Sequence, residues 1–114
     1  MNNDCLFCKI IAGEIPSQKV YEDDKLLAFK DINPQAPVHI LIIPKEHYES
    51  VNALDEKSAP IVGDIMLTAK KLAAESNLDD GYRLITNIGE NGGQTVKHLH
   101  FHLLGGVKLS EKMC

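Results

Sequence analysis

The sequence has little that would suit it to binding nucleic acid or crossing a membrane. It contains no tryptophan and only 5% aromatic residues, so a broad stacking platform for single-stranded nucleic acid is not expected. Its formal charge of −4 argues against electrostatic binding along DNA or RNA, although a local pocket can still hold a small anion. No apolar run approaches the roughly 18 residues of a membrane span. We therefore expect neither nucleic acid nor a membrane as a partner.

The sequence also lacks the signs of a secreted, disulfide-rich protein. Its N-terminus, MNNDCLFCKI, has no basic region followed by an apolar stretch and a cleavage site, so no signal peptide is expected. Cys5, Cys8 and Cys114 are an odd number of cysteines and fit reduced thiols better than a disulfide framework. These features indicate a cytoplasmic protein, and the length fits a single domain over residues 1–114.

Hydrophobic patterning predicts an α+β domain in which a five-stranded antiparallel sheet carries one long helix on a face. A short N-terminal helix is expected to end before Gly13. The long helix is expected over residues 56–76, with Pro60 in its first turn and Asp55 or Ser58 as its cap. Alternating and β-branched runs predict the strands at 20–21, 26–29, 38–44, 82–86 and 96–106.

The last expected strand, VKHLHFHLLGG, places His98, His100 and His102 at alternating positions. Side chains alternate between the faces of a strand, so the imidazoles should line one surface, roughly 6.6 Å apart, with the apolar residues against the core. Such a row could bind a transition metal, or one imidazole could act as a nucleophile while its neighbours orient a substrate. The plain alternative is a polar outer face that uses histidine by chance.

A glycine loop, NGGQT at 91–95, comes directly before the histidines. Glycine lets the backbone approach a ligand closely, and successive backbone N–H groups can form an anion-binding concavity. A Gly-Gly pair alone is usually no more than a turn. Joined to three histidines, it indicates a phosphate held beside a nucleophilic imidazole.

These motifs together resemble the histidine-triad (HIT) family, whose signature is His-φ-His-φ-His-φ-φ with φ apolar, here HLHFHLL at 98–104. The similarity extends to KIIAGEIPS, to VYEDDKLLAFKDINPQAPVHILIIPKEH and to GYRLITNIGENGGQTVKHLHFHLLGG. All three segments look like the Hint branch of the family, the nucleoside phosphoramidate hydrolases. The resemblance therefore covers nearly the whole chain and implies the HIT fold as a homodimer.

The resemblance also implies a reaction. The substrate would be a purine nucleotide, an AMP or GMP derivative, joined through its phosphate to an amine. His100 would attack phosphorus and form a nucleotidyl-histidine that water then hydrolyses, which divides one difficult displacement into two. His102 would donate to a phosphoryl oxygen, His98 would complete the triad, and His39 would support it from behind. Neither Mg²⁺ nor an organic cofactor is required.

Further roles follow by position in the family motifs. Asp31 would hold the ribose hydroxyls, and an apolar slot for the base would come from Phe7, Phe29 and Ile32. The phosphate region would be contacted by Asn87, Gly93, Gln94 and Thr95. From the residues alone, Phe29 is more simply explained as core, and Asp31 as the cap of a turn.

The pair Cys5-x-x-Cys8 is a second candidate site, which the spacing alone leaves open between zinc, redox chemistry and two small buried residues on a helix. Zinc needs four ligands, and the remaining two could be His47 and His98. Some bacterial HIT proteins, and galactose-1-phosphate uridylyltransferases, look similar in this respect. The resemblance thus implies a structural Zn²⁺ held by Cys5, Cys8, His47 and His98.

Two other functions remain open at the level of the sequence. One is another enzyme of the family, a dinucleoside polyphosphate hydrolase or a nucleotidyl transferase. The other is a non-catalytic regulatory module that binds a nucleotide or zinc.

Overall fold

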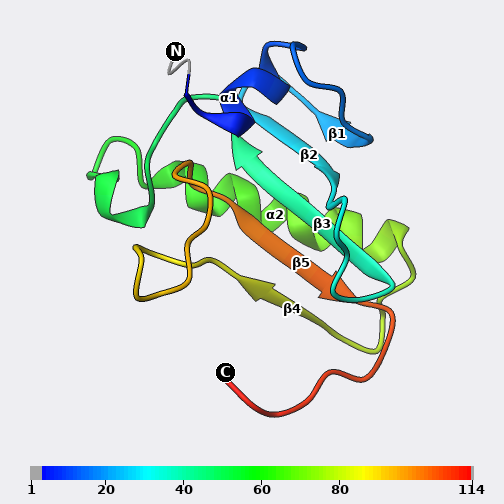
Figure 1. Cartoon of the computed structure of the whole chain (residues 1–114). Coiled ribbons are helices and arrows are strands. Elements are labelled where there is room, and N and C mark those ends of the chain that lie inside the picture. The colour runs from blue at the N-terminus through cyan, green and yellow to red at the C-terminus, as the bar shows by residue number, and fades with distance from the viewer. Residues whose placement is uncertain (1–3, 114) are drawn as a thin grey trace.

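A five-stranded antiparallel sheet forms the centre of the computed structural model, which describes residues 4–113 and so leaves the expected thiol of Cys114 outside the described residues. The elements are α1 (Leu6–Ile11), β1 (Lys19–Glu22), β2 (Leu26–Lys30), β3 (Val38–Pro44), the 3-10 turn η1 (Val51–Ala53), α2 (Pro60–Glu75), β4 (Tyr82–Ile85) and β5 (Phe101–Gly105). The strand order is β1-β2-β3-β5-β4, as Figure 1 shows. The α+β prediction is confirmed. No helix within residues 4–113 is long and apolar enough to span a membrane.

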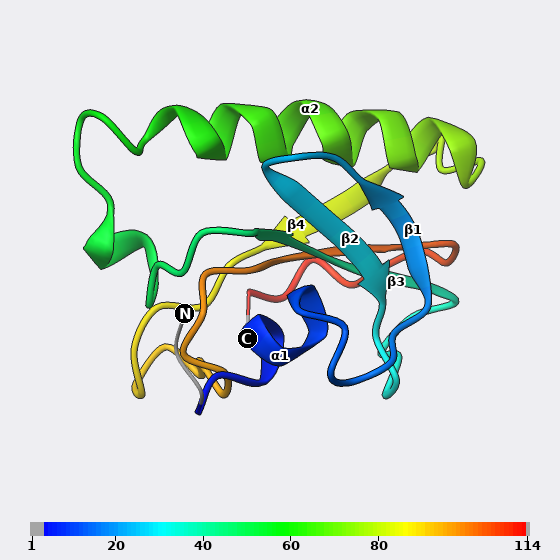
Figure 2. The ribbon, with the colours of Figure 1, turned by 90° about the horizontal axis from the view of Figure 1, so that it is seen from above.

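The two helices lie on opposite faces of the sheet (Figure 2). On one face α2 buries Ile65, Ala69 and Leu72 against strand residues such as Ile42 and Leu103. On the other face the short α1 covers a second apolar cluster, to which the sheet contributes Leu27, Phe29, Leu41 and Ile43. The central strand β3 is therefore covered on both faces, as expected for a strand whose residues are nearly all apolar.

The long helix is shorter than predicted, because it begins at Pro60 and not at residue 56. The carboxylate of Asp55 accepts hydrogen bonds from the backbone of Lys57 and Ser58, so Asp55 caps a separate turn before the helix. A proline ring clashes with the carbonyl four residues earlier, so the α-helix cannot extend back through Pro60. The helix cap itself is Ala59, which makes no side-chain cap bond.

The last strand is also shorter than predicted, since β5 begins at Phe101 and leaves His98 and His100 in irregular backbone before it. The partner strand β3 ends at Pro44, which has no N–H to continue the ladder. The amide of Leu99 instead donates to the carbonyl of Tyr48. The side chains still alternate as predicted, because Leu99 and Phe101 pack on the α2 face while His98 and His100 contact Phe7 of α1.

Candidate active site and metal centre

A cleft of about 460 Å³ opens between α1 and the sheet, on the face opposite α2. It brings together residues from α1, β2, β3, β5 and the loops that follow or precede them. Eight predicted site residues line it, namely Phe7, Phe29, Asp31, Ile32, His39, Thr95, His100 and His102. Four others, Asn87, Gly93, Gln94 and His98, do not. The face of the sheet that carries the histidine row is covered by α1, and His98 and His100 are buried beneath that helix.

His100 has a fixed tautomer within this cleft. Its Nδ1–H donates to the backbone carbonyl of His98 at 2.7 Å, so Nε2 keeps its lone pair. The carbonyl of His100 in turn accepts from the Thr86 hydroxyl at 2.8 Å, which holds the backbone in place. The ring packs edge-on against Phe7, with the centroids 5.1 Å apart. Burial lowers the pKa of His100, so the imidazole is neutral near pH 7.

His39 and His102 are joined by a hydrogen bond, and the backbone N–H of Gln35 determines which of the two rings donates. The backbone N–H of Gln35 donates to Nδ1 of His39 at 3.0 Å, so the proton of neutral His39 is on Nε2. That Nε2–H lies 2.9 Å from Nδ1 of His102 and donates to it. The proton of His102 is therefore on its own Nε2. Burial first, then His100 and His39, lower the pKa of His102 to about 4, so it stays neutral.

Asp31 lies beside these two histidines at the end of β2. One carboxylate oxygen accepts from the backbone of Asn33 at 2.8 Å, and the other lies 3.4 Å from Nε2 of His39. The residue therefore caps a turn, as the residues alone indicated, and it also lines the cleft. Asp31, His39 and His102 are close enough to hold a metal ion. The Gln35 amide disfavours this, because it would face an N–H if the Nε2 lone pair of His39 were freed for a metal.

The other end of the cleft is apolar. Phe7 and Phe29 meet edge to face, with centroids 5.6 Å apart at 73°, and both are buried. They are core and cleft wall at once, so neither description of Phe29 was complete. Ile32 also lines the cleft and is 91% exposed.

The glycine loop is held by its own side chains. The Asn87 side chain donates to the carbonyl of Gly92 at 2.8 Å. Gln94 accepts from the amide of Gly89 and donates to the carbonyls of Glu49 and Val96. Of the predicted phosphate contacts, only Thr95 reaches the cleft wall, while the polar groups of Asn87 and Gln94 shape the loop.

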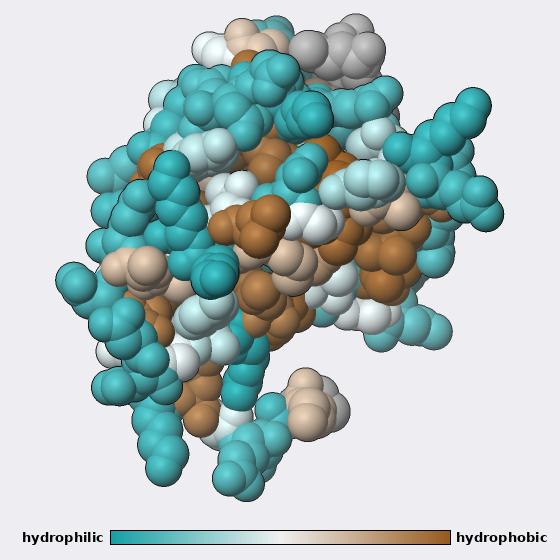
Figure 3. Space-filling view, turned by 180° about the vertical axis from the view of Figure 1, so that it is seen from behind, coloured by the Kyte–Doolittle hydropathy of each residue, from teal (hydrophilic) through white to brown (hydrophobic). Residues whose placement is uncertain are grey.

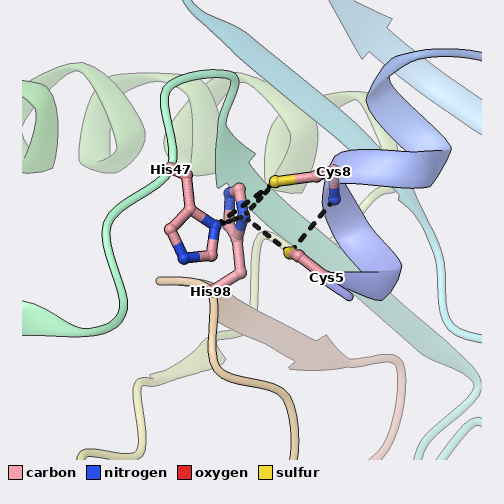
Figure 4. Close-up of side chains that lie close together, drawn as sticks. All are labelled: Cys5, Cys8, His47 and His98. Carbon is pink, nitrogen blue, oxygen red and sulfur yellow. Dashed lines mark hydrogen bonds between the residues drawn. The ribbon is translucent and has the colours of Figure 1, made fainter. Parts of the chain in front are cut away.

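A second cluster lies on the far side of His98 from the cleft histidines. We call it the thiol–histidine cluster, and it consists of Cys5, Cys8, His47 and His98. Figure 4 shows the four side chains pointing toward one another, with Cys5 at the N-cap of α1, Cys8 within α1, His47 in the segment after β3 and His98 in the segment before β5. Sγ of Cys5 and Sγ of Cys8 lie 3.3 and 3.6 Å from Nδ1 of His98. Nδ1 of His47 lies 3.3 Å from Sγ of Cys8 and 3.1 Å from Nδ1 of His98.

These separations fit four ligands of one tetrahedral metal ion. Zinc bond lengths place sulfur and nitrogen about 3.5 Å apart, and two nitrogens about 3.3 Å apart, around a tetrahedron. A hydrogen bond of His98 decides whether its Nδ1 can bind a metal ion. The Nε2–H of His98 donates to the carbonyl of Pro44 at 2.8 Å. A proline carbonyl can only accept, so the lone pair of His98 must be on Nδ1, toward the sulfurs. Burial lowers the pKa of His98 to about 4 and keeps that lone pair free.

Comparison with known proteins places the chain in a family. The model of the HIT domain matches residues 12–109. The chain belongs to the HIT family. A HIT family hydrolase from Clostridium thermocellum is 52% identical, with a TM-score of 0.97 and complete coverage of both chains. A 14 kDa zinc-binding protein from Brassica juncea is 48% identical over 94% of this chain and 96% of its own. A hypothetical histidine triad nucleotide-binding protein from Sulfolobus tokodaii is 37% identical, with a TM-score of 0.77, over 89% of this chain and 68% of its own.

The sequence motifs include side chains that the structure gathers at the cleft, but they do not reveal the groups that orient those side chains. The carbonyls of His98 and Pro44 and the amide of Gln35 are backbone groups, which leave no signature in a sequence. Thr86 was predicted only as the end of a strand, and Ser17 in the cleft wall was not singled out at all. Thr86 directly follows a strand that pairs with the histidine strand, a position from which its hydroxyl could have been expected to reach across.

Proposed function

We propose that this HIT protein hydrolyses nucleoside 5′-phosphoramidates, AMP or GMP joined to an amine, with His100 as nucleophile. The observation that supports this best is the Nδ1–H bond from His100 to the carbonyl of His98, which leaves a neutral Nε2 lone pair at a cleft wall. A neutral imidazole needs no deprotonation before it attacks. The similarity to a HIT family hydrolase is the second support.

In the proposed reaction, Nε2 of His100 forms a bond to phosphorus as the P–N bond breaks, and the leaving amine takes up a proton from water. Water then attacks the nucleotidyl-histidine, releases the nucleoside monophosphate and restores the imidazole. The Nε2–H of His102 donates to a phosphoryl oxygen and stabilises its charge as the transition state forms. His39 keeps His102 in the tautomer that can donate.

The rest of the cleft would bind the nucleoside. Asp31 accepts from the ribose hydroxyls, and the apolar end formed by Phe7, Phe29 and Ile32 takes the base. Thr95 contacts the phosphate or the leaving group from the opposite edge. Phosphate contacts from Asn87, Gly93 and Gln94 stay a prediction, which requires the glycine loop to move toward the bound phosphate.

We further propose that Cys5, Cys8, His47 and His98 hold a structural Zn²⁺. The ion would tie α1, the segment after β3 and the segment before β5 together, which supplies folding free energy and no step of the reaction. The zinc-binding name of the Brassica relative and the Nδ1 lone pair of His98 support this. Because α1 also forms a wall of the cleft, the ion would keep that wall in place.

The chain is proposed to act as a cytoplasmic homodimer. Figure 3 shows apolar side chains gathered near the centre of the face that carries α2. Leu67 of α2 is 68% exposed, and Tyr82 at the edge strand β4 is 40% exposed. A second copy of the chain could cover both by packing helix on helix and strand beside strand. Light scattering in solution tests this directly, since a monomer would contradict it.

The function is tested by His100→Ala with AMP-morpholidate and AMP-lysine as substrates. Loss of the nucleophile should lower kcat at least about 10³-fold while AMP still binds. Mass spectrometry of the wild-type protein during turnover should find the nucleotide attached to His100. Normal turnover by His100→Ala would refute the assignment. Faster cleavage of diadenosine polyphosphates than of P–N substrates would favour the alternative hydrolase, and no turnover with either would favour a binding module.

A further inference from the structure

Ser17 lines the cleft from the segment that joins α1 to β1, and it has no role in the reaction described above. Among the buried side-chain nitrogen and oxygen atoms of residues 4–113, its Oγ is the one without a hydrogen-bond partner. An unpaired buried hydroxyl is costly, and in native proteins such a group needs an explanation. A ligand that occupies the cleft would supply the missing partner.

The sheet register places Ser17 beside the proposed ribose site. The backbone N–H of Lys30 donates to the carbonyl of Gln18 at 3.0 Å, which continues the β1–β2 ladder by one residue pair. The same register puts Ser17 opposite Asp31. Side chains directly opposite each other on an antiparallel pair are about 5 Å apart at Cβ, so the two can contact one ligand.

The order of the strands then indicates which part of the nucleotide Ser17 meets. From β5, which carries His102, the sheet runs through β3 and β2 to β1, with about 4.8 Å between neighbours. A nucleotide with its phosphate at His102 and its ribose at Asp31 therefore has its base one strand further, beside Ser17. The same cleft is lined by Ile10 and Ile15, whose apolar side chains suit a flat base and not a diol.

We infer that the Ser17 hydroxyl hydrogen-bonds the polar edge of the purine base, an assignment that rests on the proposed nucleotide substrate. Serine has one side-chain torsion with three staggered wells, so the hydroxyl can turn toward the cleft and breaks no hydrogen bond when it does so. A hydroxyl both donates and accepts, so it matches the amino group of adenine and the carbonyl of guanine alike. It thus selects for a purine with a polar edge without choosing between the two.

The test is calorimetric binding of AMP and of ribose 5-phosphate to the full chain and to Ser17→Ala. The variant should bind AMP about five- to ten-fold more weakly and ribose 5-phosphate with unchanged affinity. Its melting temperature without ligand should be unchanged or higher, because no hydrogen bond is lost. Ser58→Ala is the matched control, since its hydroxyl bonds Asp55 outside the cleft. Ser58→Ala should bind AMP with the same affinity as the wild-type chain.

Unchanged AMP affinity in Ser17→Ala overturns the inference, and so does an equal loss for AMP and ribose 5-phosphate, which would assign the hydroxyl to the sugar. Binding of AMP by the unchanged chain no tighter than binding of ribose 5-phosphate overturns it as well. These affinities need no turnover. A chain that binds AMP but cleaves no phosphoramidate therefore refutes the proposed reaction, while the same measurements still decide the role of Ser17.

Discussion

All five histidines of the chain lie in two neighbouring groups, and the groups differ in where the imidazole lone pairs point. In the thiol–histidine cluster, the Nδ1 atoms of His47 and His98 converge on the sulfurs of Cys5 and Cys8. Among the cleft histidines, His39 and His102 form one chain of hydrogen bonds that begins at the amide of Gln35, and His100 donates separately to the carbonyl of His98. Convergent ligand atoms suit a metal ion, and rings with fixed tautomers suit catalysis.

The two groups are connected through the backbone of His98. The side chain of His98 belongs to the thiol–histidine cluster, while its carbonyl sets the tautomer of His100. Phe7, which stands between the two cysteines in sequence, packs edge-on against both imidazoles, with centroids 5.9 and 5.1 Å away. The thiol–histidine cluster and the cleft histidines are therefore neighbours joined by covalent and packing contacts. A substitution in one group should alter the other group more strongly the further it displaces the backbone of His98.

The largest difference between the groups should appear when metal is removed. Protein purified under reducing conditions should hold about one zinc per chain, and chelation should lower its melting temperature by more than about 10 °C. Restored zinc should restore the melting temperature, which separates metal loss from general damage. Cys5→Ser should lose the metal, whereas His102→Gln in the cleft should keep it, as elemental analysis can measure. The absence of zinc from untreated protein would contradict a metal-binding role for the thiol–histidine cluster. A melting temperature that the chelator does not change would contradict it as well.

A smaller effect is expected from the hydrogen-bonded pair of histidines in the cleft. His39→Ala removes the donor to His102 and should lower kcat roughly a hundred-fold, because His102 can then adopt the tautomer that does not donate. Nitrogen NMR should find the His102 proton on Nε2 in the unchanged chain and shared between both nitrogens in the variant. His39→Gln offers an amide that can accept from Gln35 and donate to His102, so most of the rate should return. Equal losses in both variants would show that a hydrogen bond donated to His102 does not replace what His39 contributes.

The site residues could be predicted from sequence far more fully than their orientation. Alternation correctly placed Leu99 and Phe101 against the core and the imidazoles on the opposite face, since the period of two persists where the regular ladder stops. The start of β5 could not be predicted, because it depends on Pro44 of a distant strand. The same holds for the tautomers, which depend on single backbone groups brought near by the fold.

The pattern of apolar residues likewise predicted which side of a helix or strand is buried better than it predicted where that element begins. It predicted the long helix and its buried side but not the separate turn that Asp55 caps before Pro60. Burial on two faces explains why the sequence could not separate core from cleft at Phe29, whose ring touches Phe7 and also lines the cavity. Such a residue both packs in the core and lines the cleft, and only the shape of the surrounding surface shows that it lines the cleft.

The smallest effect concerns the pH dependence of stability, and it isolates one cleft histidine. The folded chain holds His102 neutral down to about pH 4, where burial, His100 and His39 place its pKa, while the unfolded chain takes a proton near the ordinary value of 6.5. Between these values the unfolded state binds more protons. The free energy of unfolding should therefore be fully present above pH 6.5 and fall as the pH drops toward 4.

For this partly buried ring, the loss between pH 6.5 and 5.5 should be about 1 kcal/mol or less. His102→Gln removes the titrating group and keeps an amide of similar length, so its free energy of unfolding should fall less steeply over the same range. Urea titrations at several pH values in the zinc-loaded protein measure both slopes while the thiol–histidine cluster is held constant. Identical slopes in the two proteins would show that His102 is protonated in the folded state as easily as in the unfolded chain, and would remove the basis for treating it as a neutral donor.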